Sequence, residues 1–172
     1  MVKMQWLTAG IMALGLLAAC SPGEGASALA QTPSSASAAK PRHPTSGLEV
    51  IDLVVERGST KLPFKIELAA SPEAQTKGLM FRTELGDNEG MLFPSAMPGP
   101  RSFWMKNTPL SLDIIFVGTD GRITNIAANT TPYSLDPVRS SGYASAVLEL
   151  RAGRAKELEI VPGDRVIYTL PQ

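Results

Sequence analysis

The sequence predicts a mainly β fold, a compact sandwich or jelly-roll-like domain with one or two short helices. Short segments alternate apolar and polar residues with the two-residue period of strands, and Gly, Pro, Asn and Asp recur between them about every ten residues. The long helical patterns that connect parallel strands in βαβ units are missing from the sequence. Residues 48–172, about 125 in number, suffice for a single domain with a hydrophobic core.

A hairpin and a short helix are expected at the start of this domain. Residues 48–58 and 61–70 alternate as strands do, and Gly58 marks the turn between them. Ser71 is a favourable N-cap for a helix, the proline after it suits the first helical position, and Gly78 ends the segment. We therefore predict two paired strands followed by about two turns of helix.

More strands are expected along the rest of the chain. Residues 111–129 hold two β-rich runs around Asp120-Gly121, a typical hairpin turn. Prolines and a glycine between residues 94 and 100 predict a loop, and residues 130–142 predict a second loop of about a dozen residues. The remaining expected elements are strands at 90–93, 102–105, 143–150 and 164–170 and a helical turn at 152–158.

The first twenty residues predict an export signal. Lys3 precedes an apolar run too short to span a membrane, and the Leu-Ala-Ala-Cys at its end resembles the lipobox of bacterial lipoproteins. We expect Cys20 to carry a lipid anchor and residues 21–47, rich in Ala, Ser, Pro and Gly, to form a disordered tether. Two alternatives remain open: cleavage after Ala30, which would release a soluble periplasmic protein, and Cys20 as a buried core thiol.

This N-terminal region predicts a place in the cell. The protein is expected in the cell envelope, attached to the membrane through its lipid and facing the periplasm. Because Ser21 follows the cysteine, the outer membrane is favoured in a bacterium that has one.

Composition excludes several classes of function. The chain has 16 basic and 16 acidic residues, so no overall field attracts nucleic acid, which is not expected as a partner. Cys20 and His43 are the only cysteine and histidine, and both precede the predicted domain. The domain therefore lacks the residues for a Cys/His dyad, a Ser-His-Asp triad or an ordinary Cys/His zinc site. We expect no cofactor, no metal and a monomer.

The segment RSFWMKNTP, residues 101–109, is a candidate binding site. If it is extended, Phe103 and Met105 point to the core, whereas Trp104 and Lys106 point to the other side, at a rim. Asn107 would then lie in a turn. Either Trp104 is a second-layer core residue beside a solvated lysine, or the pair forms an aromatic and cationic platform for a ligand.

Acidic residues in apolar surroundings are the other candidates. Asp113 interrupts the strand LSLDIIF and Glu149 interrupts VLEL, so each must be paired, hydrogen-bonded or protonated if it is buried. Arg82, Arg101 and Lys106 are the expected partners of Asp113, and Arg82 is expected to bind an internal carboxylate rather than a ligand. A pair of acids among Glu84, Asp113 and Glu149 could also serve acid-base hydrolysis.

Five segments stand in the order and approximate spacing of a known family: GLMFRTEL, GMLF, SFWMKNTPLSLDIIFVGTDGRI, VLELRAG and PGDRV. From Leu48 to Tyr168 the chain resembles the domain of unknown function 192 family. The resemblance implies a compact, mainly β domain, often exported or lipid-anchored in bacteria, with no established activity. Glu159 stands where this family more often has glycine. The recurring segments include Arg82, Trp104, Lys106, Asn107, Asp113 and Glu149, which makes these residues candidates without giving them roles.

Three hypotheses of function follow. The first is an envelope lipoprotein whose β-domain binds a periplasmic ligand, such as a saccharide, or a protein partner at the rim formed by Trp104, Lys106 and the 130–142 loop. The second is a hydrolase that acts on envelope material through the carboxylates named above. The third is a purely structural or interaction domain, in which the recurring polar residues hold the fold.

Overall fold

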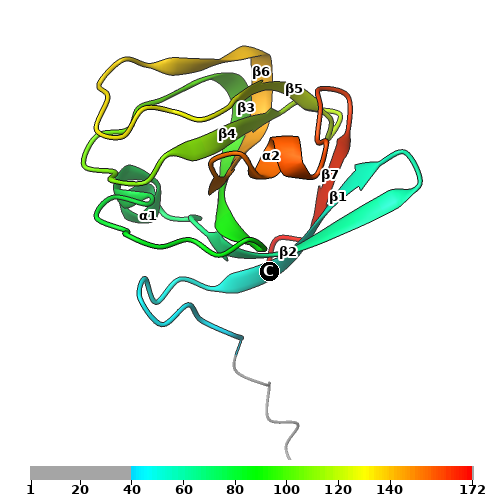
Figure 1. Cartoon of the computed structure of the whole chain (residues 1–172). Coiled ribbons are helices and arrows are strands. Elements are labelled where there is room, and N and C mark those ends of the chain that lie inside the picture. Colours follow the sequence, from blue (N-terminus) through cyan, green and yellow to red (C-terminus); the bar gives the residue numbers. More distant parts are fainter. Residues whose placement is uncertain (1–39, 172) are drawn as a thin grey trace, which may run out of the picture. The chain divides into compact units, whose positions relative to one another are not determined.

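The computed structural model describes residues 40–171, which form seven strands and two helices (Figure 1). The predicted export signal, Cys20 and most of the predicted tether lie outside the described residues. In chain order the elements are β1 (Val50–Arg57), β2 (Thr60–Leu68), α1 (Pro72–Lys77), β3 (Glu89–Phe103), β4 (Leu112–Val117), β5 (Ile123–Ala127), β6 (Val138–Arg151), α2 (Arg154–Glu157) and β7 (Arg165–Tyr168).

The seven strands form one curled sheet in the order β5-β4-β6-β3-β2-β1-β7. β2 and β3 pair in parallel, and the other neighbours are antiparallel. The two edges of the sheet meet, because Arg165 at the start of β7 pairs with Arg122 just before β5 and the Val166 N–H donates to the Gly121 carbonyl at 2.8 Å (Figure 1). The mainly β fold with two short helices confirms the predicted fold class.

Both faces of the curled sheet are covered. Along β4, Ile115 and Val117 belong to a hydrophobic cluster on the inner face, whereas Ile114 and Phe116 belong to a second cluster on the outer face. Ala155 of α2 packs into the inner cluster, and the segment around α1 packs on the outer one. Consequently β4 is buried along its whole length rather than alternating between buried and exposed residues.

Several elements form as the sequence predicts. The β1–β2 hairpin turns at Gly58, and β4 and β5 form the predicted hairpin around Asp120-Gly121. At the start of α1, the Ser71 hydroxyl accepts a hydrogen bond from the Ala74 N–H at 3.1 Å. Glu159, where the family resemblance suggests glycine, has a φ of 55°, in the left-handed region that glycine adopts most easily.

Two loop predictions were wrong. β3 is a single strand of 15 residues that continues through the prolines between residues 94 and 100. Its pairing with β6 shifts register between Pro94 and Gly99, and such irregularities accommodate prolines in a strand. β6 begins at Val138, so the loop predicted for 130–142 ends at residue 137.

The folded region starts before Leu48. The His43 N–H donates to the Leu48 carbonyl at 2.8 Å, the Val50 N–H donates to the Pro41 carbonyl at 2.8 Å, and Arg42 pairs with Glu49. The end of the predicted tether is therefore attached to the domain. Within residues 40–171, no helix is long and apolar enough to cross a membrane.

Candidate functional site

A pocket of about 470 Å³ opens on the outer face, between α1 and the end of β3. Its wall combines buried apolar side chains with cationic and aromatic ones, and among the described residues Glu149 is the only acid that lines it. The apolar part consists of Leu79, Phe93, Met105 and Leu112. The cationic and aromatic part consists of Lys77, Arg101, Trp104 and Lys106.

Glu149 is held rigidly in the centre of the sheet. In β6 it pairs with Met91 of β3 on one side and with Ile114 of β4 on the other. β3 comes very close here, because a Cβ atom on Gly90 would lie 2.3 Å from the Glu149 carbonyl oxygen. Only glycine permits this approach. The position of Glu149 is thus set by three strands rather than by a mobile loop.

The Glu149 carboxyl group borders the pocket and forms no hydrogen bond or ion pair with the described residues. The residue is 5% exposed, and its side chain forms no hydrogen bond or ion pair within residues 40–171. Loss of hydration raises its pKa to about 8. At neutral pH the group is therefore a neutral carboxylic acid, which can both donate and accept a hydrogen bond.

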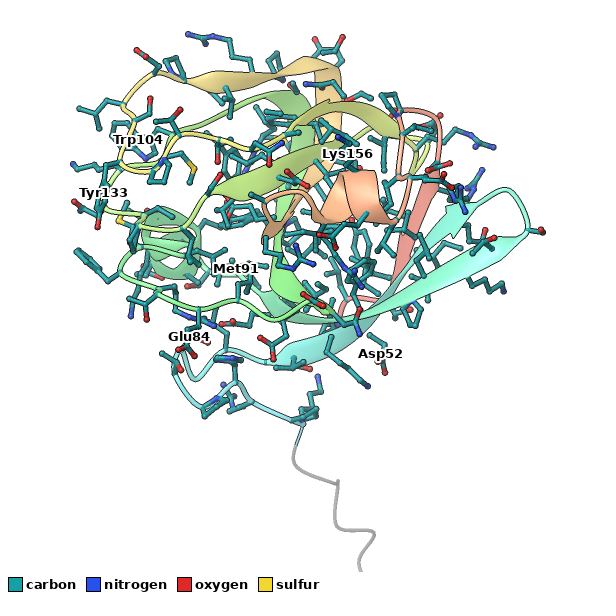
Figure 2. All side chains as sticks on the ribbon, viewed as in Figure 1. Asp52, Glu84, Met91, Trp104, Tyr133 and Lys156 are labelled. Atoms are coloured by element: carbon teal, nitrogen blue, oxygen red, sulfur yellow. The ribbon has the colours of Figure 1, made fainter. Side chains whose placement is uncertain are left out.

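Trp104 and Lys106 lie at the mouth of this pocket. Trp104 is 51% exposed and Lys106 is exposed, whereas Met105 is 3% exposed and Phe103 packs on the outer cluster. This confirms the predicted division between core and rim, although β3 ends at Phe103. The Lys106 ammonium lies 5.1 Å from the centre of the Trp104 ring, a cation–π contact. Figure 2 shows Trp104 and Tyr133 on the same side of the domain, away from Lys156 of α2.

Three residues beside the pocket have left-handed backbone conformations. They are Phe81, Asn107 and Tyr133, with φ values of 63°, 55° and 61°. The Phe81 N–H donates to the Asn107 carbonyl at 2.8 Å and the Tyr133 N–H donates to the Thr108 carbonyl at 3.1 Å, so the three loops meet at the turn after Lys106. Each such conformation costs about 1–2 kcal/mol for a residue other than glycine. Phe81 and Tyr133 nevertheless present aromatic rings that are 71% and 62% exposed.

Asp113 is buried and hydrogen-bonded, one of the predicted outcomes, but among the described residues none of the three expected cations is its partner. It pairs across the strands with Leu150 and faces the inner side of the sheet, opposite to Glu149. Its Oδ1 accepts hydrogen bonds from the N–H groups of Asn129 at 2.9 Å and Gly153 at 3.1 Å, and its Oδ2 accepts one from Ala155 at 2.9 Å. Three backbone donors satisfy the buried carboxylate, and α2 is thereby attached to β4.

Arg82 binds an internal carboxylate, as predicted, but the partner is Glu67 of β2. The Arg82 Nη1 lies 2.7 Å from the Glu67 Oε1, and the two side chains are 12% and 3% exposed. His43 Nδ1 lies 3.7 Å from the same oxygen. Sequence reasoning missed Glu67 because its alternation with Ile66 and Leu68 suggested a solvent-facing side chain. The outer face is covered at this position, so the side chain is buried.

The predicted acids do not share one cleft. Glu84 is exposed and lines a different pocket, together with His43 and Arg82. Asp113 and Glu149 face opposite sides of the sheet. Retaining and inverting hydrolysis both need two carboxyl groups that flank the same bond, and these three residues do not provide such a pair. Within residues 40–171, no group of three Asp, Glu, His or Cys side chains is arranged to hold a metal ion.

Comparison with known proteins gives the family. The sequence profile of the domain of unknown function 192 family, described as an uncharacterised ACR, matches residues 53–168. The chain belongs to this family. The match covers both the Glu149 pocket and the Arg82–Glu67 pair. A comparison with curated proteins found no match to this member of the family.

Two crystal structures resemble this family member. One is a protein of unknown function from Novosphingobium aromaticivorans DSM 12444, with 50% identity and a TM-score of 0.73 over 76% of this chain and 94% of that one. The other comes from Sinorhizobium meliloti 1021 and is provisionally described as a transcription regulator. It has 35% identity and a TM-score of 0.68 over 70% of this chain and 95% of that one.

Proposed function

We propose that the protein is an envelope lipoprotein whose domain binds a small periplasmic ligand, a saccharide in the first instance, in the pocket above Glu149. The single observation that carries this proposal is the unpartnered carboxyl group of Glu149, which is almost fully buried and lines the pocket. A hydrogen bond contributes about 0.5–1.5 kcal/mol net. A ligand that accepts a hydrogen bond from Glu149 would gain this free energy without breaking a bond within the described part of the protein.

The surroundings of Glu149 suit a small polar ligand with an apolar face. The apolar side chains of Phe93 and Met105 exclude water from one part of the pocket, while Trp104 offers an aromatic ring at its mouth. Sugars have hydroxyl oxygens for the carboxylic acid and C–H faces for an aromatic ring. Ligand pockets of about this size commonly combine a mostly apolar wall with a few directed polar groups.

Neither of the other hypotheses accounts for Glu149. A two-carboxylate hydrolase needs a second acid in the pocket, and Glu149 has none. A purely structural role explains Asp113, which accepts three backbone hydrogen bonds, and Arg82, which neutralises Glu67. It does not explain a largely buried carboxyl group that forms no hydrogen bond or ion pair with the described residues.

Protein binding at the rim is the second candidate function. The exposed rings of Phe81 and Tyr133 are held by left-handed backbone conformations. Such strain is maintained only where the surrounding structure imposes it, and it is concentrated at functional sites. Exposed aromatic residues are also enriched at protein interfaces. A peptide or protein partner would therefore contact the rim rather than Glu149.

Nucleic acid is not part of this proposal. The Sinorhizobium structure is provisionally described as a transcription regulator. In this chain the formal net charge is zero, and the two helices of the described residues are six and four residues long. Neither helix is long enough to act as a recognition helix in a major groove.

The anchor is tested separately from the ligand. We expect Cys20 to incorporate a labelled fatty acid in cells and the Cys20→Ala variant to lose that label. Label that persists in Cys20→Ala would contradict the lipoprotein proposal and leave the pocket proposal unaffected.

Thermal unfolding of the full-length protein tests the pocket. The protein is screened against soluble cell-wall sugar fragments and short peptides. A ligand at a hundred times its Kd adds about 2.7 kcal/mol to the free energy of unfolding, which raises the melting temperature by several degrees. The Glu149→Leu variant should be at least as stable as wild type without ligand, because it removes an unpaired buried polar group, and it should lose the shift.

The matched control is Glu84→Leu, which makes the same chemical change at an exposed acid outside this pocket. It should keep the ligand-induced shift. A sugar-induced shift that survives in Glu149→Leu would refute the proposed site. Strong destabilisation of unliganded Glu149→Leu would show instead that Glu149 holds the fold. A shift produced by peptides alone and lost in Tyr133→Ala would favour the second candidate.

A further inference from the structure

The pocket is cationic in a protein that is neutral overall. The chain has 16 basic and 16 acidic residues. The pocket wall, in contrast, carries Lys77, Arg101 and Lys106 against the single acid Glu149. Because burial raises the pKa of Glu149 to about 8, this acid carries almost no charge at neutral pH. The cations at the pocket therefore act on a ligand without an opposing charge from the wall.

The partly buried guanidinium group of Arg101 has no acidic partner among residues 40–171. Its Nη2 lies 3.4 Å from the Gln75 Oε1, and its guanidinium carbon lies 5.6 Å from the centre of the Phe103 ring. Both contacts are neutral. Burial lowers the pKa of Arg101, which reflects the loss of hydration. Arg82 and Arg151, in contrast, form ion pairs with Glu67 and Glu157.

Lys106 and Trp104 present a positive charge and an aromatic ring together. The ammonium group lies near the ring, and neither Lys106 nor Lys77 forms an ion pair within the described part of the chain. A planar or ring-shaped ligand that contacts the indole would bring its substituents next to the ammonium group. An anionic substituent would gain from this position, whereas an amine would be repelled.

We propose that the ligand is an acidic saccharide, a sugar ring that carries a carboxylate group. This inference rests on the proposed ligand-binding function. The carboxylate lies between Arg101 and Lys106 at the mouth of the pocket, and a hydroxyl, ether or amide oxygen of the sugar accepts a hydrogen bond from the carboxyl group of Glu149. Arg101 and Lys106 contact the carboxylate of the ligand, and Glu149 contacts an oxygen elsewhere on the sugar. The pocket therefore selects a ligand that has both a negative charge and a hydrogen-bond acceptor.

The contribution of the ligand's charge to binding is measured with pairs of sugars that have nearly the same shape. Binding of D-glucuronic acid and N-acetylmuramic acid to the full-length protein at pH 7 is measured by calorimetry and compared with binding of their methyl esters, which keep the ring and remove the charge. Two partly exposed cations predict about tenfold tighter binding of each acid at low ionic strength. This difference should shrink as salt is added, since salt screens charges near the surface.

Two variants and one control assign the effect to the pocket. Arg101→Gln and Lys106→Gln should each weaken binding of the acids by about threefold and leave binding of the esters nearly unchanged. Lys156→Gln removes an exposed lysine of α2, which does not line the pocket, and should change neither (Figure 2). The comparison between Lys106→Gln and Lys156→Gln is the sharper one, because both variants remove the same charge.

The possible failures have different meanings. If acids and esters bind equally well, or if Lys106→Gln behaves like Lys156→Gln, the acidic ligand class is refuted while sugar binding stands. If neither sugars nor esters bind, the acidic saccharide is refuted, and the melting-temperature screen with Glu149→Leu decides separately whether the pocket binds anything else. Tighter binding of the acids, lost in Arg101→Gln and Lys106→Gln alone, supports the inference.

Discussion

Asp113 and Glu149 are two buried acids on neighbouring strands, and the fold treats them in opposite ways. Asp113 faces the inside of the curled sheet and is 0% exposed, whereas Glu149 faces the outer cluster and is 5% exposed. Asp113 accepts three backbone hydrogen bonds, but Glu149 has no partner within the described residues. The two acids are thus similarly buried, but Asp113 accepts several hydrogen bonds from the described residues and Glu149 accepts none.

The difference separates an acid that holds the fold from one that is free to bind. The donors to Asp113 come from the turn at Asn129 and from the start of α2, so this carboxylate joins segments that are distant in sequence. Glu67 is an intermediate case on the outer face, because a single cation, Arg82, compensates its burial. The Glu149 side chain forms no hydrogen bond or ion pair with the described residues, and of these three acids it is the one that lines the pocket.

The largest expected effect tests the structural acid. Asp113→Leu should lower the free energy of unfolding by roughly 4 kcal/mol, because three buried N–H groups lose their acceptor. Glu149→Leu, the same kind of change on the other face, should have no cost. Urea denaturation of both variants measures the contrast. If both variants lose the same free energy of unfolding, Asp113 and Glu149 do not differ in their contribution to stability.

An intermediate effect is expected from the ion pair. Arg82→Met leaves Glu67 buried without its cation and should lower the free energy of unfolding by about 3 kcal/mol. The double variant Glu67→Leu/Arg82→Met should recover much of this loss in urea denaturation, since no unpaired charge remains. A cost below about 1 kcal/mol for Arg82→Met would mean that this pair behaves like an exposed surface bridge.

The last prediction concerns the pH dependence that Glu149 causes, and its effect per pH unit is the smallest of the three. The pKa of Glu149 is about 8 in the folded protein against an ordinary value of 4.5, so the unfolded chain loses this proton first. The contribution of Glu149 to the free energy of unfolding is therefore fully present below about pH 4.5. It decreases as the pH rises and is lost above about pH 8. The expected slope is about 1 kcal/mol per pH unit.

Glu149→Gln isolates this contribution, because glutamine has nearly the same shape and does not titrate. The difference in free energy of unfolding between Glu149→Gln and wild type, measured in urea, should grow in favour of the variant from about pH 5 to about pH 8 and then level off. A difference that stays constant over this range would show that Glu149 is ionised in the folded protein at neutral pH.

Local sequence patterns were sufficient for part of the fold. The β1–β2 and β4–β5 hairpins and α1 formed as predicted, because turn residues such as Gly58 and a cap such as Ser71 act on their immediate neighbours. The prediction that prolines divide β3 into two strands is wrong. Whether a proline ends a strand depends on its partner strand, and here the irregular pairing with β6 accommodates it.

The candidate site could be predicted only as a set of residues. Asp113 and Glu149 look alike in sequence, since each is a single acid in an apolar strand. Their roles differ because Gly153 and Ala155, some forty residues away in sequence, place N–H groups beside one acid and not the other. Glu67 was missed for a related reason: strand alternation gives the face of a side chain but not what covers that face.

The sequence by itself determined the mainly β class, most of the strands and the segment that forms the rim of the pocket, because these depend on local propensity, turn chemistry and two-residue periodicity. It also gave the family, through the resemblance of five segments in order. Only the tertiary structure decided which acids are satisfied, that Arg82 pairs with Glu67, and that Arg101, Lys106 and Glu149 line one pocket. Hydrogen bonds, burial and electrostatic potential depend on distances between atoms in space. The curled sheet brings together residues that are far apart in the sequence, so these distances cannot be read from the sequence.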